Sequence, residues 1–186
     1  VRFAQDAAAP TAAFDFAEVI QQDLERSGRV RLLPRERMPA APSRADAVVA
    51  ADWRSLGTDY VVVGRAGAGA APGQSLVEFE LLNVLNGQKL LSERLTVPAA
   101  TARNGAHRIS DRVHEKILGV RGAFATRIAY VSVDGAPPSQ RYQLIVADSD
   151  GEGARVILES RQPLMSPAWS PDGEWLAYVS FEARAS

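Results

Sequence analysis

The sequence contains no cysteine, so disulfide bonds, thiolate zinc sites and cysteine nucleophiles are excluded within this chain. It also has no long apolar run, since no window approaches the roughly 18 apolar residues of a membrane span. An excess of charge is missing too, because 21 Lys and Arg residues nearly balance 22 Asp and Glu residues. Nucleic acid is therefore not expected as a partner, since phosphate binding requires a basic surface.

Motifs for catalysis and cofactor binding are absent as well. The chain has no G-x-S-x-G nucleophile elbow, no P-loop and no serine supported by a histidine. Gly67 and Gly69 follow an expected strand, but Pro72 and another strand come next, where a dinucleotide site requires a helix. The sequence thus predicts no enzyme and no cofactor. The chain begins at Val1 without a methionine or an apolar signal region, which suggests a processed or trimmed N-terminus.

Two sets of possible metal ligands can be judged by their spacing. Residues at positions 1, 3, 5, 6 and 12 of a calcium-binding EF-hand loop are matched by Asp148, Asp150, Glu152, Gly153 and Glu159. The flanks favour strands where an EF-hand needs helices, so a solvated hairpin turn is the preferred interpretation and calcium the alternative. His107 and His114 are too far apart for the adjacent-turn spacing of a zinc helix, which favours surface or interdomain packing. We therefore expect no metal site.

Residues 1 to about 120 alternate between helical and strand periodicity. Apolar residues at helical spacing predict helices over 14–28, 48–57 and 101–119. Asp15 and Glu18 form a possible capping box, and Gly28 and Gly57 are suited to end the first two helices. The second helix should bury one face with Val49, Trp53 and Leu56, and the third a stripe with Ala102, Ala106, Ile109, Val113 and Ile117.

Strands are expected over 29–34, 59–66, 75–85 and 88–98. The last two flank Asn86 and Gly87, a dipeptide suited to a two-residue type I′ hairpin because both central residues need positive φ. Together with the helices, these strands predict an α/β N-terminal domain, a two-layer sandwich in which helices pack on a mixed sheet.

The pattern changes after Phe124, where short strands separated by turns replace helical periodicity. Strands are expected over 126–133, 141–148 and 154–160, followed by a hairpin over 163–182. The tetrapeptide AYVS occurs at 129–132 and again at 177–180, an offset of 48 residues. A period of about 40–50 residues with four short strands is typical of a β-propeller blade. The alternative is a chance recurrence of common strand residues.

The turn inside the second hairpin has recognisable chemistry. Pro171 pre-sets φ, Asp172 can accept a local backbone hydrogen bond, and Gly173 allows positive φ. Bulky faces for packing between blades are offered by Trp169, Trp175, Tyr178 and Phe181. As the structural propeller turn we predict Pro167, Trp169, Ser170, Pro171, Asp172 and Gly173.

The stretch PLMSPAWSPDGEWLAYVSFE closely resembles a propeller repeat of the TolB family, which belongs to the Gram-negative Tol-Pal envelope system. The resemblance continues through LGTDYVVVGRA, HRISDRVHEKILGVRGAFATRIAYV and YQLIVADSDG, in the family's order. WSPDG alone is moderately specific, since propellers of serine peptidases use similar turns. The collinear set is far more specific and spans nearly the whole chain.

The resemblance implies an α/β domain over 1–121 and, over 122–186, the start of an all-β propeller of which about one and a half blades are present. It implies a non-enzymatic periplasmic scaffold that couples outer membrane, peptidoglycan and inner-membrane machinery for envelope integrity and constriction during cell division. The implied partners are the Pal lipoprotein and TolA, whose contact segments are largely missing here. An alternative is the accessory propeller region of a serine peptidase whose catalytic domain is absent.

Two structural expectations follow from a partial propeller. The domain boundary should lie between Gly119 and Ala125, where helical patterning ends and strand patterning begins. The open blade faces should be partly uncovered at Ile128, Tyr130, Leu144, Val146, Trp169, Leu176 and Tyr178. Residues 1 to about 120 are then expected to be the independently stable part.

Overall fold

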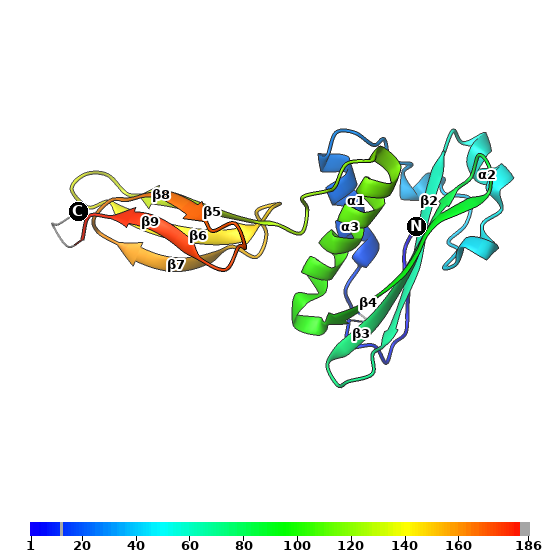
Figure 1. The fold of residues 1–186 in the computed structure, drawn as a ribbon, viewed down its shortest axis with the longest axis horizontal. Coiled ribbons are helices and arrows are strands. Elements are labelled where there is room, and N and C mark those ends of the chain that lie inside the picture. The colour runs from blue at the N-terminus through cyan, green and yellow to red at the C-terminus, as the bar shows by residue number, and fades with distance from the viewer. Residues whose placement is uncertain (12, 183–186) are drawn as a thin grey trace. The chain divides into compact units, whose positions relative to one another are not determined.

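A computed structural model describes residues 1–11 and 13–182. The chain divides into two compact units, Val1–Ala125 and Thr126–Ser186, each with its own strands (Figure 1). Residues 183–186 of the expected second domain lie outside the described residues. A domain boundary between residues 121 and 122 stays a prediction, which limited proteolysis can test.

The first unit is built on a four-stranded mixed sheet in the order β1-β2-β3-β4. Its strands are β1 (Ala4–Gln5), β2 (Tyr60–Ala68), β3 (Gln74–Asn83) and β4 (Gln88–Pro98). β1 runs parallel to β2, whereas β3 is antiparallel to both β2 and β4. The strand expected over 29–34 does not form, so this prediction is wrong. The strand that pairs with β2 at this edge of the sheet is β1. The side chains of Leu32 and Leu33 pack against the two cores, so the apolar residues here belong to a loop that is partly buried and not to a strand.

The α-helices beside the sheet are α1 (Phe16–Arg26), α2 (Ala50–Ser55) and α3 (Ala102–Leu118). Short 3₁₀ turns lie at η1 (Arg35–Arg37), η2 (Ala45–Ala47) and η3 (Ala99–Thr101). Asp15 caps α1 by accepting the Glu18 N–H at 3.1 Å, as expected. Gly119 ends α3 with φ 72°. The expected inward position of Val49 is wrong, because α2 begins one residue later and Val49 is exposed.

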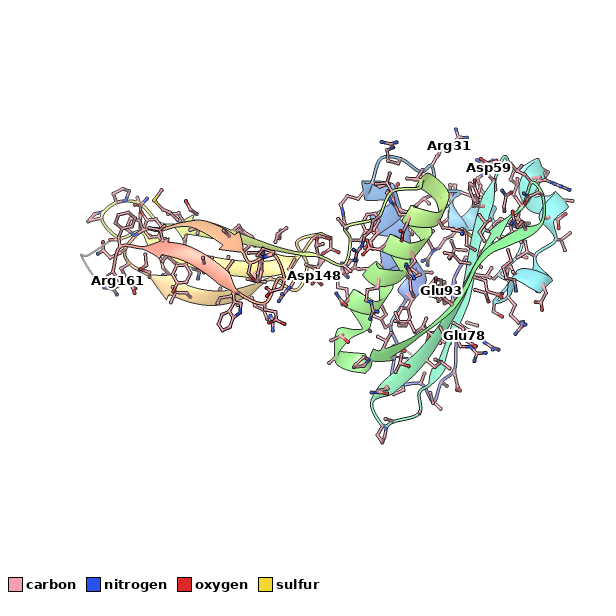
Figure 2. All side chains as sticks on the ribbon, in the orientation of Figure 1. Arg31, Asp59, Glu78, Glu93, Asp148 and Arg161 are labelled. Carbon is pink, nitrogen blue, oxygen red and sulfur yellow. The ribbon has the colours of Figure 1, made fainter. Side chains whose placement is uncertain are left out.

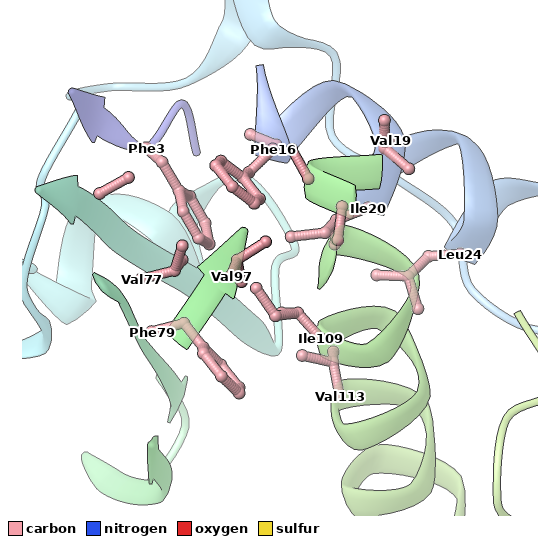
Figure 3. Packing of buried hydrophobic residues seen from close by; sticks show 14 of the residues in the cluster. Phe3, Phe16, Val19, Ile20, Leu24, Val77, Phe79, Val97, Ile109 and Val113 are labelled. Carbon is pink, nitrogen blue, oxygen red and sulfur yellow. The ribbon is translucent and has the colours of Figure 1, made fainter. Parts of the chain in front are cut away.

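Two apolar cores lie on opposite faces of the sheet, because neighbouring strand residues point to opposite sides. The main core packs α1 and α3 against β3 and β4, with Phe16, Phe79 and Ile109 at most 2% exposed (Figure 3). The predicted stripe of α3 contributes Ala106 and Val113 to this core. The smaller core on the other face holds Ala45, Trp53, Val61, Val63, Leu82 and Val84. Sequence periodicity therefore identified the helical layer correctly.

The hairpin between β3 and β4 differs from the expected two-residue turn. Asn83 pairs with Gln88, so residues 84–87 form a four-residue loop in which Gly87 has φ 72°. Val84 is fully buried in the smaller core, and its N–H donates to the Asp59 carbonyl at 2.9 Å. Burial of Val84 and its hydrogen bond to Asp59 place this residue outside the β3–β4 ladder, which accounts for a loop longer than two residues.

The second unit contains a three-stranded antiparallel sheet of β5 (Arg127–Asp134), β6 (Arg141–Asp148) and β7 (Arg155–Ser160). A separate hairpin follows, with β8 (Leu164–Trp169) and β9 (Leu176–Ser180). β8 packs on β5 and β6. These strands occupy the ranges predicted from the sequence, and they form two incomplete sheets, since a complete propeller blade has four strands.

Only some of the residues expected on the uncovered blade faces are exposed to solvent. Ile128, Tyr130 and Tyr178 are about 40% exposed. Leu144 and Val146 are buried, contrary to the prediction, because β8 packs on the strands of the first sheet. Within the described residues, none of the helices combines the length and apolar character needed to cross a membrane.

Candidate functional site

The predicted propeller turn joins β8 to β9. The Ser170 carbonyl accepts the Gly173 N–H at 2.9 Å, and the Ser170 N–H donates to the Trp175 carbonyl at 2.9 Å. Gly173 has φ 71°, which costs an L-residue roughly 1–2 kcal/mol. The turn therefore favours glycine at this position, and Pro171 supplies a compatible φ on its other side.

The polar side chains of this turn bind each other and the local backbone. The Ser170 hydroxyl donates to Asp172 Oδ1, which also accepts the Glu174 N–H at 3.0 Å. Ser170 Oγ in turn accepts the Trp175 N–H at 2.9 Å. The hydrogen bond from Ser170 holds the pKa of Asp172 below its ordinary value, and the Glu174 amide adds to the effect. These groups stabilise a loop and are not arranged as a nucleophile with its base.

Arg127 fastens the turn to the first sheet of the second unit. Its Nη2 donates to the Gly173 carbonyl at 2.6 Å, and its guanidinium lies 4.6 Å from the centre of the Trp169 ring. The residue comes from β5, more than 40 positions before its partners, so local sequence patterns gave no signal for it. Arg127, Trp169 and Gly173 together form what we call the Arg127 clamp.

The other predicted turn residue, Pro167, lies within β8. The register of β8 and β9 shifts between Met165 and Ala168, so Pro167 sits in a bulge, where a missing N–H is tolerated. The strand also places Ser166 at φ 51°, an uncommon conformation for a residue other than glycine. The bulge bends β8 just before the turn.

Large apolar side chains are exposed on the hairpin and on the first sheet. Trp175 is 74% exposed and Phe181 is 50% exposed. On the first sheet, Tyr130 is partly exposed and Val156 is largely exposed. Ile145 of β6 pairs with both residues and so lies between them. Exposed apolar side chains that lie next to one another are typical of surfaces that pack against other protein.

The possible calcium loop forms a hairpin turn between β6 and β7. The Gly151 N–H donates to the Asp148 carbonyl at 2.9 Å, and the Glu152 N–H donates to Asp150 Oδ1 at 3.0 Å. Glu159 lies along β7, where Gln143 Nε2 donates to it at 3.0 Å. The four candidate carboxylate ligands are therefore not gathered in one loop, because Glu159 lies in β7. That calcium is not bound stays a prediction, and calorimetric titration is expected to show no binding in the micromolar range typical of sensor loops.

The two histidines have separate environments. His107 is buried on α3, and its Nδ1 lies 2.7 Å from Asp23 Oδ2 on α1. Arg26 donates to the other oxygen of Asp23 at 2.7 Å. His114 Nδ1 donates to the Val120 carbonyl at 2.9 Å. The Asp23–His107 pair joins α1 and α3 inside the first unit. Burial of His107 corrects the surface position, one of the two expectations for this residue, whereas interdomain packing stays a prediction.

Comparison with known protein families agrees with this architecture. A model of the TolB amino-terminal domain matches residues 1–90, and a model of the TolB beta propeller domain matches residues 114–186. The chain belongs to the TolB family. Family membership confirms the resemblance found in the sequence, as well as the fold class of an α/β domain followed by a partial propeller.

Individual relatives support the same assignment. The Tol-Pal system protein TolB of Xanthomonas campestris pv. campestris is 47% identical over 168 residues, covering 90% of this chain and 38% of the relative. The protein of the same name from Xylella fastidiosa is 45% identical over 174 residues, covering 94% and 39%. The crystal structure of TolB from Acinetobacter baumannii superposes with a TM-score of 0.84 at 38% identity, covering 99% of this chain and 43% of that one. The chain thus spans about two fifths of the length of these relatives.

Proposed function

We propose that this chain is part of a non-enzymatic, periplasmic scaffold of the Tol-Pal system. The observation that carries the proposal is the collinear match of two TolB family models over both units. Curated relatives that share nearly half of their aligned residues with the chain are named Tol-Pal system proteins. The scaffold would couple the outer membrane, the peptidoglycan and the inner-membrane machinery, and would act in envelope integrity and constriction during cell division.

The proposed partners are the Pal lipoprotein and TolA, as the family resemblance implies. Supporting this, the second unit exposes large apolar side chains, as interaction surfaces do, and its turn is held by internal hydrogen bonds. We assign no partner contact to a residue of this chain.

A non-enzymatic role fits the local chemistry. Ser170 and Asp172 are bonded to each other within the turn, while His107 pairs with Asp23 and His114 with the Val120 carbonyl. Among the described residues, these serine, aspartate and histidine groups do not converge as a triad. The serine-peptidase alternative gains no support, because the curated relatives are named as Tol-Pal proteins.

A chimeric protein tests the proposal. This chain would replace the matching residues of the Xanthomonas campestris relative, and the chimera would be expressed in a strain of that organism lacking its own TolB. We expect restored detergent resistance and normal constriction, together with calorimetric binding to purified Pal. A folded chimera that binds no Pal and leaves the strain detergent-sensitive would contradict the proposal. A chimera without the first unit serves as the negative control.

A further inference from the structure

The outer edge of β4 has backbone groups that point away from the sheet. β4 is the last strand of the sheet, and among the described residues no strand pairs with its outer side. The Ala99 N–H donates to the Gly73 carbonyl, so the backbone of Ala99 faces β3. Because this direction recurs at every second residue of a continuous register, the N–H and C=O groups of Val97 and Leu95 also face β3. Since backbone direction alternates, the N–H and C=O groups of Ser92, Arg94 and Thr96 face outward.

A groove of about 550 Å³ lies beside this edge, between β4 and α3. Its lining includes Phe79, Leu95 and Ile109, of which Phe79 and Ile109 belong to the main core. Glu93, which Figure 2 shows beside α3, lies on the wall. A free strand edge next to a helix is the arrangement in which an extended peptide can be added as a further strand.

The groove presents a surplus of available positive charge. Arg108 and Arg112 lie one helical turn apart on α3, and Arg121 follows the helix. Two of the acidic neighbours are already engaged, because Arg112 lies 3.4 Å from Glu93 and 3.5 Å from Glu115.

The third acidic group at the groove, Asp111, is engaged as well. It accepts the N–H groups of Phe124 at 2.7 Å and Ala125 at 3.3 Å. Arg108 and Arg121 are both exposed, and among the described residues neither has an acidic partner. The two arginines are therefore free to meet carboxylates of a bound segment.

We propose that this groove binds an extended, acidic peptide segment of a partner protein, which adds to β4 as a further strand and sets its carboxylates against Arg108 and Arg121. The site covers Ser92–Thr96. At the N-terminal end of β4, the edge is protected by the register shift opposite Leu81 and Leu82 and by the charge of Lys89. At the C-terminal end, Pro98 ends the strand. The site lies in the first unit and is proposed as an interaction surface separate from the exposed apolar residues of the second unit.

Two peptides provide the probe for the intact 186-residue chain. One is a fluorescein-labelled octapeptide that alternates Glu with Val and Thr, and the other carries Lys in place of each Glu. In anisotropy titrations at low salt, we expect saturable binding of the acidic peptide only, with affinity that falls as salt is added. Absence of saturable binding, or equal binding of the Lys peptide, would overturn the proposal.

Two variants separate strand addition from simple charge attraction. Arg108→Glu with Arg121→Glu should weaken binding about tenfold or more, whereas the exposed control Arg31→Glu should leave it unchanged. Thr96→Pro removes an outward N–H that β3 does not use, so the sheet should stay folded by circular dichroism. It should also weaken binding about tenfold, because the added strand loses a backbone hydrogen bond and meets the proline ring. Unchanged affinity in either variant would refute the proposed site.

Discussion

At the scale of single residues, the Arg127 clamp joins parts of the second unit that are distant in sequence. The charged guanidinium stacks on Trp169 and donates to a backbone carbonyl of the turn. The sequence predicted the turn from Pro171, Asp172 and Gly173, because turn chemistry is local. It could not predict Arg127, since the contact depends on how β8 packs on β5.

Replacement of Arg127 tests this clamp. Arg127→Ala should lower the free energy of unfolding of the second unit by about 0.5–1.5 kcal/mol, through loss of the cation–π contact and the hydrogen bond. Trp fluorescence during urea unfolding can follow the change, because the guanidinium contacts Trp169. Arg161→Ala, at another exposed arginine of the second unit, is the matched control. Equal stability of the two variants would show that the clamp contributes nothing.

Gly64 is a second informative residue, because a side chain there would enter the main core. A Cβ atom at Gly64 would overlap the ring of Phe3, which is 2% exposed. Gly64→Ala should therefore destabilise the first unit by about 1–3 kcal/mol. Gly67→Ala is the control, since a Cβ there meets no atom within 4 Å. Thermal unfolding of both variants gives the comparison, and similar losses in both would contradict the packing described.

At the scale of elements, Glu80 holds η2 against the sheet. Its Oε2 accepts the Ala45 N–H at 2.7 Å, and its Oε1 accepts hydrogen bonds from Lys89 and Ser92. Burial by itself would raise the pKa of Glu80, but these three partners outweigh burial and lower the pKa below its ordinary value of 4.5. The ionised carboxylate is thus favoured by folding.

The lowered pKa of Glu80 gives a pH prediction. A group whose pKa is lower in the folded state stabilises the fold above its ordinary pKa, and this stability is lost as the pH falls through the folded-state pKa. Glu80→Gln should therefore be less stable than the parent by about 1 kcal/mol at neutral pH. The difference should shrink in the acidic range below 4.5. Urea unfolding measured across pH tests this, and a constant difference would contradict it.

Errors in predicting elements have physical causes. Helices α1 and α3 were found because their apolar stripes and terminating glycines are local signals. The segment around Leu32 and Leu33 has the composition of a strand, but its side chains are buried without strand pairing. Val84 likewise enters a core that involves α2, which local turn preferences cannot anticipate.

At the scale of the whole molecule, the two units differ in how completely their apolar residues are covered. The first unit has two closed cores, whereas the second exposes Trp175, Tyr178 and Phe181. The family, and with it the propeller class, could be predicted because its repeats have a specific turn and a fixed period. The burial of individual residues could not be predicted, because it depends on how β8 packs on the first sheet, where Leu144 is buried and Tyr130 is exposed.

Hydrogen exchange tests most directly the claim that the second unit is part of a larger scaffold. We would compare the 186-residue chain, shown to be monomeric by light scattering, with the full-length Xanthomonas chimera. In the shorter chain, strands β5 to β9 should exchange faster than β2 and β3, and in the chimera their protection should rise while that of β2 and β3 stays the same. Protection of β5 to β9 equal to that of β2 and β3 in the monomeric chain, and unchanged in the chimera, would contradict the account.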